Sequence, residues 1–427
     1  MQKAGYGSAP ASSGIILPGT LKFASLRLHH ISKHALAMIW FVTAISILFA
    51  IVDWLVYRRR IRYKNNCIRR GFIGIVLVSY LLPILLIGIQ TLLPDNSTAW
   101  MKTAQWIIFL YLLLQNCRLG YYLGLLVDHR RQFSRTGVVL ALACAFMLVW
   151  GATHGRQAIV VNRVEVQSPR LPGSFDGLRI VQFSDLHIGT LINPEKEMNR
   201  LVDTINALHP DLIVFTGDLV NVRYSELTPR YREILGRLQA PYGILSVLGN
   251  HDVGRYIKDT IQLPADTSTR MLVKTQQEMG WHVLENETVY LHRGNDSISV
   301  SGIAFDRAQH IYRHRRKIPD VELTSAYQSI PEGTYNLTLA HAPQIWEEII
   351  ASGYGDLTLS GHVHSMQLRI NLFGRGLSPA SWLYKRWSGR YEDGLGHTLY
   401  INDGIGYVGY PMRLGAYPEV TLFILKR

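Results

Sequence analysis

Residues 178–187 read LRIVQFSDLH, an apolar run that passes directly into Asp185 and His187. Short apolar runs rich in β-branched and aromatic residues are typical of buried strands, so we predict a strand over Leu178–Phe183. The two polar residues are two positions apart, which lets both side chains point to the same side where the strand ends. This stretch therefore predicts a strand that places a carboxylate beside an imidazole.

The same arrangement recurs further along the chain, where side chains that bind metal ions again follow apolar strands. The strands and the residues after them are Leu212–Phe215 with Asp218, Gly243–Leu248 with Asn250, His251 and Asp252, Leu337–Ala340 with His341, and Leu357–Leu359 with His362 and His364. Ligands in layered α/β folds gather at the carboxyl ends of strands. We therefore expect these side chains to converge on one site.

The remaining pattern after residue 155 supports an α/β domain. Ile159–Val166 alternates as a strand, and helices are predicted over Pro194–Leu208 and Tyr231–Leu238, between the apolar strands. Tyr290–Ile303 alternates like a pair of antiparallel strands. Such a pair, combined with strands that alternate with helices, predicts a mixed sheet.

The first 155 residues have a different composition and are predicted to form a transmembrane helical domain. A helix needs about twenty apolar residues to cross a bilayer. Four segments reach or approach this length: Leu36–Val56, Phe72–Leu93, Trp106–Val127 and Gly137–Trp150. We therefore expect a helical bundle of about four spans over residues 1–155, followed by an aqueous domain over residues 156–427.

Basic residues are distributed unevenly between the predicted spans. The first loop contains Arg58, Arg59, Arg60, Arg62, Lys64, Arg69 and Arg70, the third contains Arg130, Arg131 and Arg135, and the second contains only Lys102. The positive-inside rule places the first and third loops in the cytoplasm. This predicts a multi-pass protein of the bacterial inner membrane with a periplasmic or extracellular domain. The residues before the first span favour the reverse orientation: Lys3, Lys22, Arg27 and Lys33.

The formal net charge of +13 does not indicate nucleic-acid binding. Much of the excess lies beside the apolar segments, where basic side chains meet the headgroups of membrane lipids, and no aromatic-basic recognition motif is present. The three cysteines, Cys67, Cys117 and Cys144, all precede the aqueous domain. That domain therefore has neither disulfides nor thiolate ligands.

Carboxylate oxygens and imidazole nitrogens together suit two divalent cations such as manganese, iron or zinc, of which we favour manganese. Asp218 follows a glycine that allows a sharp turn, which makes it the natural bridge between two ions. Singly, each motif has a simpler interpretation: Asp-x-His and Gly-Asp are common in turns, and a lone His341 is typical of a hydrogen-bonded core residue. The order of all five motifs favours a metal site.

The order Asp-x-His, Gly-Asp, Gly-Asn-His-Asp, His and Gly-His-x-His resembles that of the calcineurin-like metallophosphoesterase family over nearly all of residues 158–427. The resemblance implies a four-layer α/β domain with two mixed β-sheets. It implies a first metal ion on Asp185, His187 and His364, a second on Asn250, His341 and His362, and Asp218 between them. It also implies that His251 contacts a phosphoryl oxygen or protonates the leaving group and that Asp252 orients His251.

The C-terminal region resembles a membrane-associated, YkuE-like branch of that family, which includes pyrophosphatases of lipid A synthesis. The matching positions are Gln367, Gly389-Arg390-Tyr391, residues 400–406, Arg413 and Pro418-Glu419. Members of this branch commonly have Gly-Gly after the last histidine, where this chain has Ser365-Met366. The difference affects the expected shape of the pocket floor and leaves the expected ligands unchanged.

Together these features predict a membrane-anchored hydrolase of phosphoric esters or anhydrides. The expected substrate is a lipid-linked phosphomonoester or pyrophosphate at the membrane surface. One alternative is a pyrophosphatase of the UDP-2,3-diacylglucosamine type from lipid A synthesis, which needs access to a cytoplasmic nucleotide. Another is a catalytically inactive metal-binding membrane scaffold, against which the complete ligand set and His251 argue.

Three further features each allow two interpretations. One cluster fits a lipid-facing surface or a substrate clamp: Arg313, Arg315, Arg316 and Lys317. Residues 382–387, WLYKRW, fit a membrane-water interface or an aromatic core patch. Arg118, beside Gln115 and Asn116 in the third apolar segment, fits a polar cavity or a structural pair.

Overall fold

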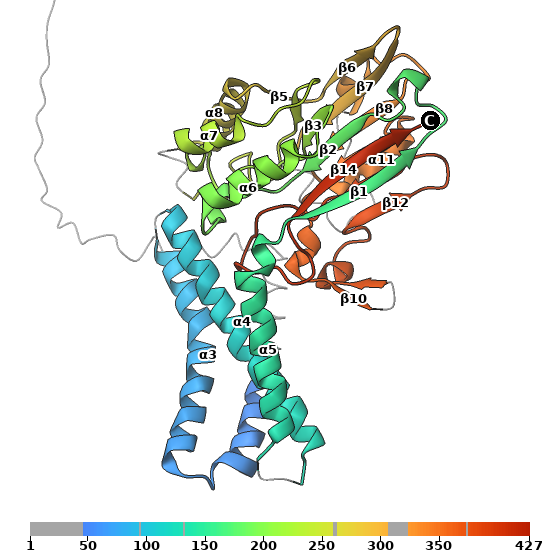
Figure 1. The fold of residues 1–427 in the computed structure, drawn as a ribbon. Helices are drawn as coiled ribbons and strands as arrows, with labels where there is room; N and C mark the ends of the chain where they lie inside the picture. The colour runs from blue at the N-terminus through green and yellow to red at the C-terminus, as the bar shows by residue number, and fades with distance from the viewer. Residues whose placement is uncertain (1–45, 94, 131–132, 259–262, 306–322, 373–374) are drawn as a thin grey trace, which may run out of the picture. The chain divides into compact units, whose positions relative to one another are not determined.

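The computed structural model of the chain describes residues 46–427 except 94, 131–132, 259–262, 306–322 and 373–374 (Figure 1). The chain divides into two compact units, Met1–Tyr80 and Leu81–Arg427, and the division falls inside helix α3 (Asn66–Leu92). The second unit contains two further long helices and the α/β domain. The basic cluster at residues 313–317 lies outside the described residues.

The first unit is helical where it is described. Residues 46–56 are helical and continue as η2 (Tyr57–Ile61), and α3 begins five residues later, at Asn66. The phenol of Tyr80 donates a hydrogen bond of 2.8 Å to Oδ2 of Asp53, which joins two polar groups of these helices. Of the predicted span Leu36–Val56, the part up to residue 45 lies outside the described residues.

The long helices of the second unit are α4 (Thr98–Val127) and α5 (Arg135–Thr153), and each begins at a serine whose hydroxyl caps the first turn. The two helices approach closely at two glycines that have no side chain. A Cβ on Gly124 would collide with the backbone of Gly137. Arg118 of α4 is buried and donates to Oε1 of Gln115 at 3.0 Å. This hydrogen bond within α4 favours the interpretation of Arg118 as part of a structural pair.

Two stretches of the described residues are long and apolar enough to cross a membrane, Asn66–Leu86 and Arg135–Gln157. They correspond to two of the predicted spans, Phe72–Leu93 and Gly137–Trp150. Helix α4 does not reach the same hydropathy because Gln115, Asn116 and Arg118 interrupt its apolar sequence. The predicted four-span bundle is therefore not confirmed.

The α/β domain contains two six-stranded sheets (Figure 1). The first has the order β1-β14-β2-β3-β4-β5, and its neighbours are parallel except β14 and β2. The C-terminal strand β14 thus inserts between two strands from the beginning of the domain. The strands are β1 (Val160–Gln167), β2 (Arg179–Phe183), β3 (Leu212–Phe215), β4 (Ile244–Ser246), β5 (Trp281–Val283) and β14 (Glu419–Lys426).

The second sheet has the order β12-β13-β9-β8-β7-β6, antiparallel at both edges and parallel between them. Its strands are β6 (Glu287–Arg293), β7 (Asp296–Ile303), β8 (Asn336–Ala340), β9 (Leu357–Ser360), β12 (Gly389–Glu392) and β13 (Thr398–Ile401). A separate hairpin pairs β10 (Ile370–Leu372) with β11 (Arg375–Leu377). The predicted mixed sheet is confirmed, and the predicted antiparallel pair is β6 and β7.

Helices cover the outer faces of the two sheets, which gives four layers. Along β2, Val181 and Phe183 face the helices, whereas Ile180 faces the second sheet. Burial on both faces explains why the strand sequence is apolar throughout. The covering helices are α6 (Pro194–Asn206), α7 (Pro229–Leu235) and α8 (Ala265–Glu278) on the first sheet, and α10 (Leu323–Tyr327) and α11 (Trp346–Ala351) on the second. Short helical turns are η3 (Gly155–Gln157), η4 (Gly173–Phe175), η5 (Ile188–Thr190), η6 (Tyr224–Glu226), η7 (Pro343–Ile345), η8 (His364–Gln367) and η9 (Pro379–Trp382).

Candidate metal centre

The connections that follow β2, β3, β4, β8 and β9 bring all the predicted ligands together. Because the two sheets lie face to face, the carboxyl ends of strands from both sheets open onto the same place. Every ligand except His362 is buried, and His362 is half-buried. The residues are Asp185, His187, Asp218, Asn250, His341, His362 and His364.

A first group of ligand atoms comes from Asp185, His187 and His364. Their ligand atoms all lie within 4.8 Å of one another. Nε2 of His364 lies 3.2 Å from Oδ1 of Asp185 and 3.1 Å from Nε2 of His187. One carboxylate oxygen and two imidazole nitrogens at this spacing fit a single divalent cation.

A second group comes from Asp218, His341 and His362, with Asn250 beside it. Nε2 of His341 lies 3.3 Å from Oδ2 of Asp218 and 3.2 Å from Nδ1 of His362. The same Oδ2 of Asp218 lies 3.7 Å from Nε2 of His187, in the first group. Asp218 therefore stands between the two groups, as a bridging carboxylate must.

The surroundings of His341 fit a cation in the second group. Its Nδ1 lies 2.7 Å from the carbonyl oxygen of Thr216, so Nδ1 carries the proton and Nε2 presents a lone pair in the neutral ring. That lone pair faces Oδ1 of Asn250 at 3.0 Å and Oδ2 of Asp218. Acceptor atoms directed at one another repel unless a proton or a metal ion lies between them.

Arg413 supports His364 from behind. This fully buried guanidinium donates to the carbonyl oxygen of Gly406 at 2.7 Å and to Nδ1 of His364 at 3.1 Å. Because a guanidinium only donates, Nδ1 accepts, and Nε2 carries a proton toward Asp185 in the metal-free ring. Binding of a cation at Nε2 would require that proton to move to Nδ1, where it would replace the hydrogen bond from Arg413.

Charge around the two groups favours a cation. Burial raises the pKa of Asp185 and of Asp218, but neighbouring histidines outweigh it and hold both pKa values well below the usual range. Burial lowers the pKa of His341, yet Asp218 outweighs it and raises that pKa to about 9. Burial also holds the pKa of His187 well below its usual range. The site thus keeps two ionised carboxylates and favours positive charge between them.

The ligands are held by a backbone in the left-handed region. The φ angles of Asp185, Asp218 and His362 are 53°, 62° and 76°. Ser365 and Met366, at the position of the expected Gly-Gly pair, have φ angles of 49° and 46°. A non-glycine residue pays about 1–2 kcal/mol for this conformation. A 2.6 Å hydrogen bond from Oγ of Ser365 to Oδ1 of Asp403 helps to hold it here.

His251 lies against the bridging carboxylate. Its backbone N–H donates to Oδ1 of Asp218 at 2.7 Å, and its ring Nδ1 lies 2.6 Å from the carbonyl oxygen of Asn221. The Asn221 carbonyl therefore holds the proton on Nδ1 and leaves Nε2 for a substrate. Tyr256 packs over the ring, with centroids 4.2 Å apart.

The carboxylate of Asp252 bonds to the backbone of two loops, one of which carries His251. Its carboxylate accepts hydrogen bonds of 2.7 to 3.1 Å from four backbone N–H groups, at residues 218, 219, 220 and 249. The ring of His251 is instead held by Asn221. Asp252 thus ties the connection after β3 to the connection after β4, because its two oxygens satisfy the free donors of both turns. It orients the loop that carries His251 rather than the imidazole itself.

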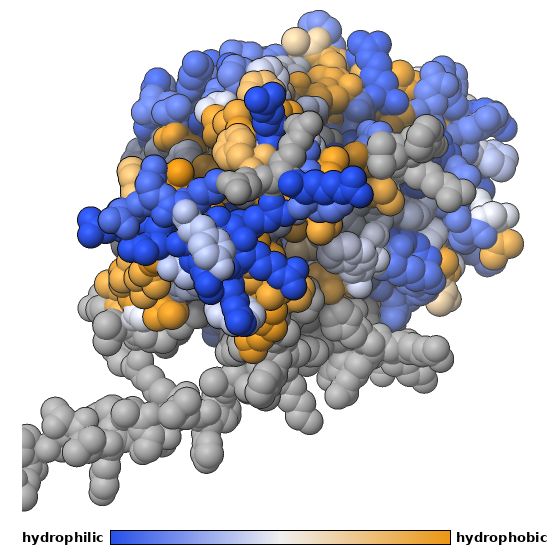
Figure 2. Space-filling model, turned by 90° about the horizontal axis from the view of Figure 1, so that it is seen from below, coloured by the Kyte–Doolittle hydropathy of each residue, from blue (hydrophilic) through white to orange (hydrophobic). Residues whose placement is uncertain are grey.

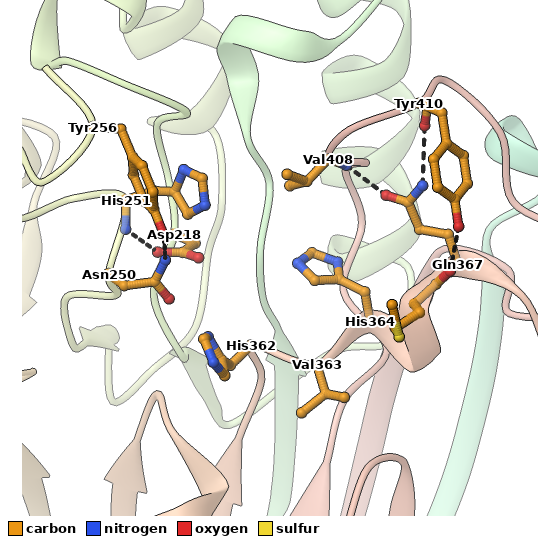
Figure 3. Close-up of a pocket in the computed structure, with 11 residues that line it drawn as sticks. Asp218, Asn250, His251, Tyr256, His362, Val363, His364, Gln367, Val408 and Tyr410 are labelled. Carbon is orange, nitrogen blue, oxygen red and sulfur yellow. Dashed lines mark hydrogen bonds between the residues drawn. The ribbon is translucent and has the colours of Figure 1, made fainter. Parts of the chain in front are cut away.

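A cavity of about 250 Å³ opens beside these ligands (Figure 3). In Figure 3, Tyr256, His251, Asp218 and Asn250 lie on one side of it, and Val408, Gln367 and Tyr410 lie on the other, with His362 and His364 between. Gln367 accepts from the backbone of Val408 and donates to the carbonyl oxygen of Tyr410 at 3.0 Å. The pocket therefore combines a polar wall with a fixed wall that is partly apolar.

Residues 178–366 match the calcineurin-like phosphoesterase family, a range that contains every predicted ligand. This chain carries a calcineurin-like phosphoesterase domain. The metallophosphoesterase YkuE of Bacillus subtilis is 29% identical over 70% of this chain and 97% of its own length. The transmembrane protein with metallophosphoesterase domain of Danio rerio is 29% identical over 69% of this chain and 63% of its own length. UDP-2,3-diacylglucosamine pyrophosphatase LpxG of Chlamydia muridarum is 26% identical over 54% of this chain and 77% of its own.

The predicted family and its YkuE-like branch are confirmed by these matches. Calcineurin-like phosphoesterases are metal-dependent phosphoester hydrolases, and the two ligand groups agree with that chemistry. Membrane association agrees with the named transmembrane relatives and with the two apolar helices.

The sequence did not point to several residues that complete the phosphoesterase site. Nδ2 of Asn250 donates to the hydroxyl of Tyr256 at 3.1 Å, which turns Oδ1 of the amide toward His341. Asn221 holds His251 through its backbone carbonyl, for which any residue type would serve. Arg413 had been noted only as a feature of the branch.

Proposed function

We propose that this chain is a membrane-anchored phosphoesterase with two divalent metal ions, manganese favoured, that hydrolyses a phosphomonoester or pyrophosphate bond of a lipid-linked substrate. The observation that carries the proposal is the position of Asp218. Its carboxylate joins both ligand groups and also receives the backbone N–H of His251. Metal ligands and a proton-carrying side chain thus meet at one carboxylate.

The ligand groups would hold one ion on Asp185, His187 and His364 and the other on His341, His362 and Asn250, with Asp218 shared. Two such ions, when bound, activate a water molecule and neutralise charge on the phosphoryl oxygens. When protonated on both nitrogens, His251 would donate from Nε2 to a phosphoryl oxygen or deliver that proton to the leaving oxygen. Asn221 fixes the ring in the orientation that this role needs.

The apolar wall of the pocket supports a lipid-linked substrate. Tyr410, which lines the pocket, packs in a cluster with Met412 and with side chains of the two long helices. The helix residues of this cluster are Phe109 and Leu113 of α4 and Leu148 and Ala152 of α5. An acyl or prenyl chain leaving the pocket along this wall would stay in contact with apolar surface.

An anchor in the bilayer is supported by the outer face of α5. Its large side chains Val139, Leu142 and Phe146 recur at helical spacing and are 63%, 65% and 67% exposed. A face of this kind is costly in water and stable against lipid.

The contacts of the loop before α4 support a domain outside the cytoplasm. Asp95 and Asn96 of that loop bond to Arg223 and Tyr256 of the domain, and α5 leads directly into β1 through η3. The opposite ends of α4 and α5 carry Arg130 and Arg135. Figure 2 views the molecule from below and shows that hydrophilic residues gather on this face, with hydrophobic residues beside them. By the positive-inside rule the arginine end lies in the cytoplasm, and in a bacterial inner membrane the domain is then periplasmic.

The test is hydrolysis by the purified full-length protein in detergent with Mn²⁺. Release of phosphate from prenyl and diacyl phosphates and pyrophosphates is expected from the wild type and is expected to disappear in Asp218→Asn and His251→Ala. Asp203→Asn, an equal change at a carboxylate that is 72% exposed, serves as the matched control. Wild-type rates in Asp218→Asn would refute the proposal, and a fully metal-loaded but inert wild type would favour the scaffold.

A second candidate function rests on the similarity to LpxG. That relative is named as a UDP-2,3-diacylglucosamine pyrophosphatase, so cleavage of this nucleotide to release UMP is the discriminating assay. A topology reporter fused after Arg427 adds an independent measurement. A reporter that is active only in the cytoplasm would favour this candidate over the periplasmic phosphoesterase.

A further inference from the structure

We propose that four exposed apolar side chains beside the metal centre insert into the surface of the lipid bilayer and deliver the substrate to the pocket. These residues, called here the apolar rim, are Ile370 of β10, Leu377 of β11, and Trp382 and Leu383 at the end of η9. The inference rests on the membrane anchoring in the proposed function. It adds the surface of the domain that touches lipid.

The apolar rim leaves large apolar side chains exposed on the surface of the domain. Ile370 and Leu377 are 51% and 53% exposed, and Trp382 is 81% exposed. Ile370 and Leu377 are direct partners across the β10–β11 hairpin, so both side chains lie on one face of it. An isolated two-stranded hairpin is marginally stable in water. Covering the large apolar pair on its surface would stabilise it, because apolar surface is removed from water.

Backbone pairing connects the apolar rim to the end of a membrane helix. Leu368, two residues before Ile370, pairs with Leu414. The preceding residue Arg413 donates its N–H to the carbonyl oxygen of Gly151 at 3.2 Å, in the last turn of α5. Met412 packs against Ala152 of the same turn. The hairpin is thus attached where α5 leaves the predicted bilayer.

The figure supports this position. In Figure 1 the β10 strand lies on the edge of the domain from which α4 and α5 extend. A bilayer crossed by α5 would therefore have its surface near the hairpin. The occupant of the apolar rim is a lipid surface, because the α5 anchor alone would bring the apolar rim to the bilayer.

Composition also favours a bilayer surface over a protein partner. Trp382 and Leu383 are exposed, while Tyr384 and Trp387 pack into the core around Trp346. The aromatic-core interpretation of the 382–387 stretch therefore fits Tyr384 and Trp387, and the membrane-interface interpretation stays a prediction for Trp382 and Leu383. Lys385 and Arg386 share the carboxylate of Glu347, which leaves a net positive charge beside the exposed indole. Indole and basic side chains together are typical of the headgroup region.

The apolar rim lies next to the mouth of the catalytic pocket. Met366 and Gln367 line the pocket and lie four and three residues before the start of β10. At the other end, Oγ of Ser378 donates to the carbonyl oxygen of Ser365 at 2.6 Å, and Tyr384 packs edge-on to His362. A phosphate group at the metal ligands would therefore have its apolar chain beside the apolar rim, at the bilayer surface.

Depth in the bilayer tests the inference independently of catalysis. Leu377→Cys is introduced into a full-length chain whose Cys67, Cys117 and Cys144 are alanine, labelled with an environment-sensitive fluorophore, and placed in nanodiscs containing lipids with a quencher near the headgroup. We expect blue-shifted and quenched emission. The matched control is Leu395→Cys, because Leu395 is 84% exposed in the β12–β13 connection. Equal emission at both positions would overturn the inference, whether or not the protein hydrolyses any lipid.

Substrate preference provides the second test. In the double variant Leu377→Gln, Trp382→Ala we expect the KM for a lipid-linked substrate to rise about tenfold, because two exposed apolar side chains no longer contact lipid. Hydrolysis of a water-soluble aryl phosphate should be unchanged, since the metal ligands are untouched. Equal loss on both substrates with intact folding, or no loss on either, would contradict a lipid-contacting role.

Discussion

The guanidinium of Arg223 forms a two-pronged ion pair with the carboxylate of Asp95, with N–O distances of 3.1 and 2.6 Å. Asp95 lies between α3 and α4, and Arg223 lies two residues after Asn221, whose carbonyl holds the ring of His251. The next residue, Asn96, donates to the carbonyl oxygen of Tyr256 at 2.6 Å. The loop before α4 therefore braces both loops that surround His251.

Loss of this brace should lower catalysis more than stability. For Asp95→Asn we expect kcat to fall about tenfold through misplacement of His251. The free energy of unfolding should change by no more than about 1 kcal/mol, because Asp95 is 37% exposed. Steady-state kinetics and thermal unfolding of Asp95→Asn and of Glu233→Gln, which breaks an exposed ion pair, would measure this. An unchanged kcat in Asp95→Asn would show that the loop does not position His251.

Metal binding should stabilise the domain. At a free Mn²⁺ concentration of 100 times Kd, the free energy of unfolding should rise by about 2.7 kcal/mol, because the folded chain binds the ion and the unfolded chain does not. Chelation should reverse the gain, and Asp218→Asn should show little of it. Thermal unfolding with and without Mn²⁺ measures the effect, and weakly buffered titrations should record proton release on binding. Equal stabilisation of wild type and Asp218→Asn would place the ions elsewhere.

Tyr256 should control the affinity of the second metal position. Tyr256→Phe removes the hydroxyl that receives Nδ2 of Asn250, so the amide oxygen is no longer held toward His341. Loss of such an outer contact commonly weakens metal affinity by about tenfold or more. Calorimetric titration with Mn²⁺ would measure it, with Tyr242→Phe as control for the loss of a hydroxyl hydrogen bond away from the site. Equal affinities in the two variants would contradict this role.

Glu226 should make stability depend on pH. Its carboxylate accepts N–H groups of Asn221 and Val222, but burial outweighs these bonds and raises its pKa from 4.5 to about 7. A raised pKa means that the stabilising contribution is complete below pH 4.5 and is lost as the pH rises through about 7. The difference corresponds to about 3 kcal/mol.

Denaturation at pH 5 and pH 8 would test this dependence. The free energy of unfolding of the wild type, relative to that of Glu226→Gln, should be lower at pH 8 than at pH 5. Glu233→Gln, at an exposed position nearby, should track the wild type at both. A wild-type advantage over Glu226→Gln that stays constant with pH would show that Glu226 does not titrate near pH 7 in the folded domain.

Local sequence was sufficient to predict the family and the side chains that converge on the candidate metal centre. Asp185 and His364 each follow a short apolar strand within a few residues, so strand and ligand appear together in the chain. Because carboxyl ends of strands meet at one edge, the position of each ligand follows from its strand. The predicted mixed sheet was confirmed for the same reason.

Only the tertiary structure decided what surrounds those ligands. Strand β14 pairs with β1 and β2 across more than half of the chain, and no local pattern encodes such a partner. Asp252 bonds to backbone groups more than thirty residues away, Arg413 reaches His364 across 49 positions, and Asp95 reaches Arg223 across 128. A side chain's own sequence neighbours indicate its chemistry and its strand. The contacts of that side chain depend on the distant segments that the two sheets and the long helices bring within hydrogen-bonding distance. Packing of the whole domain determines which segments those are.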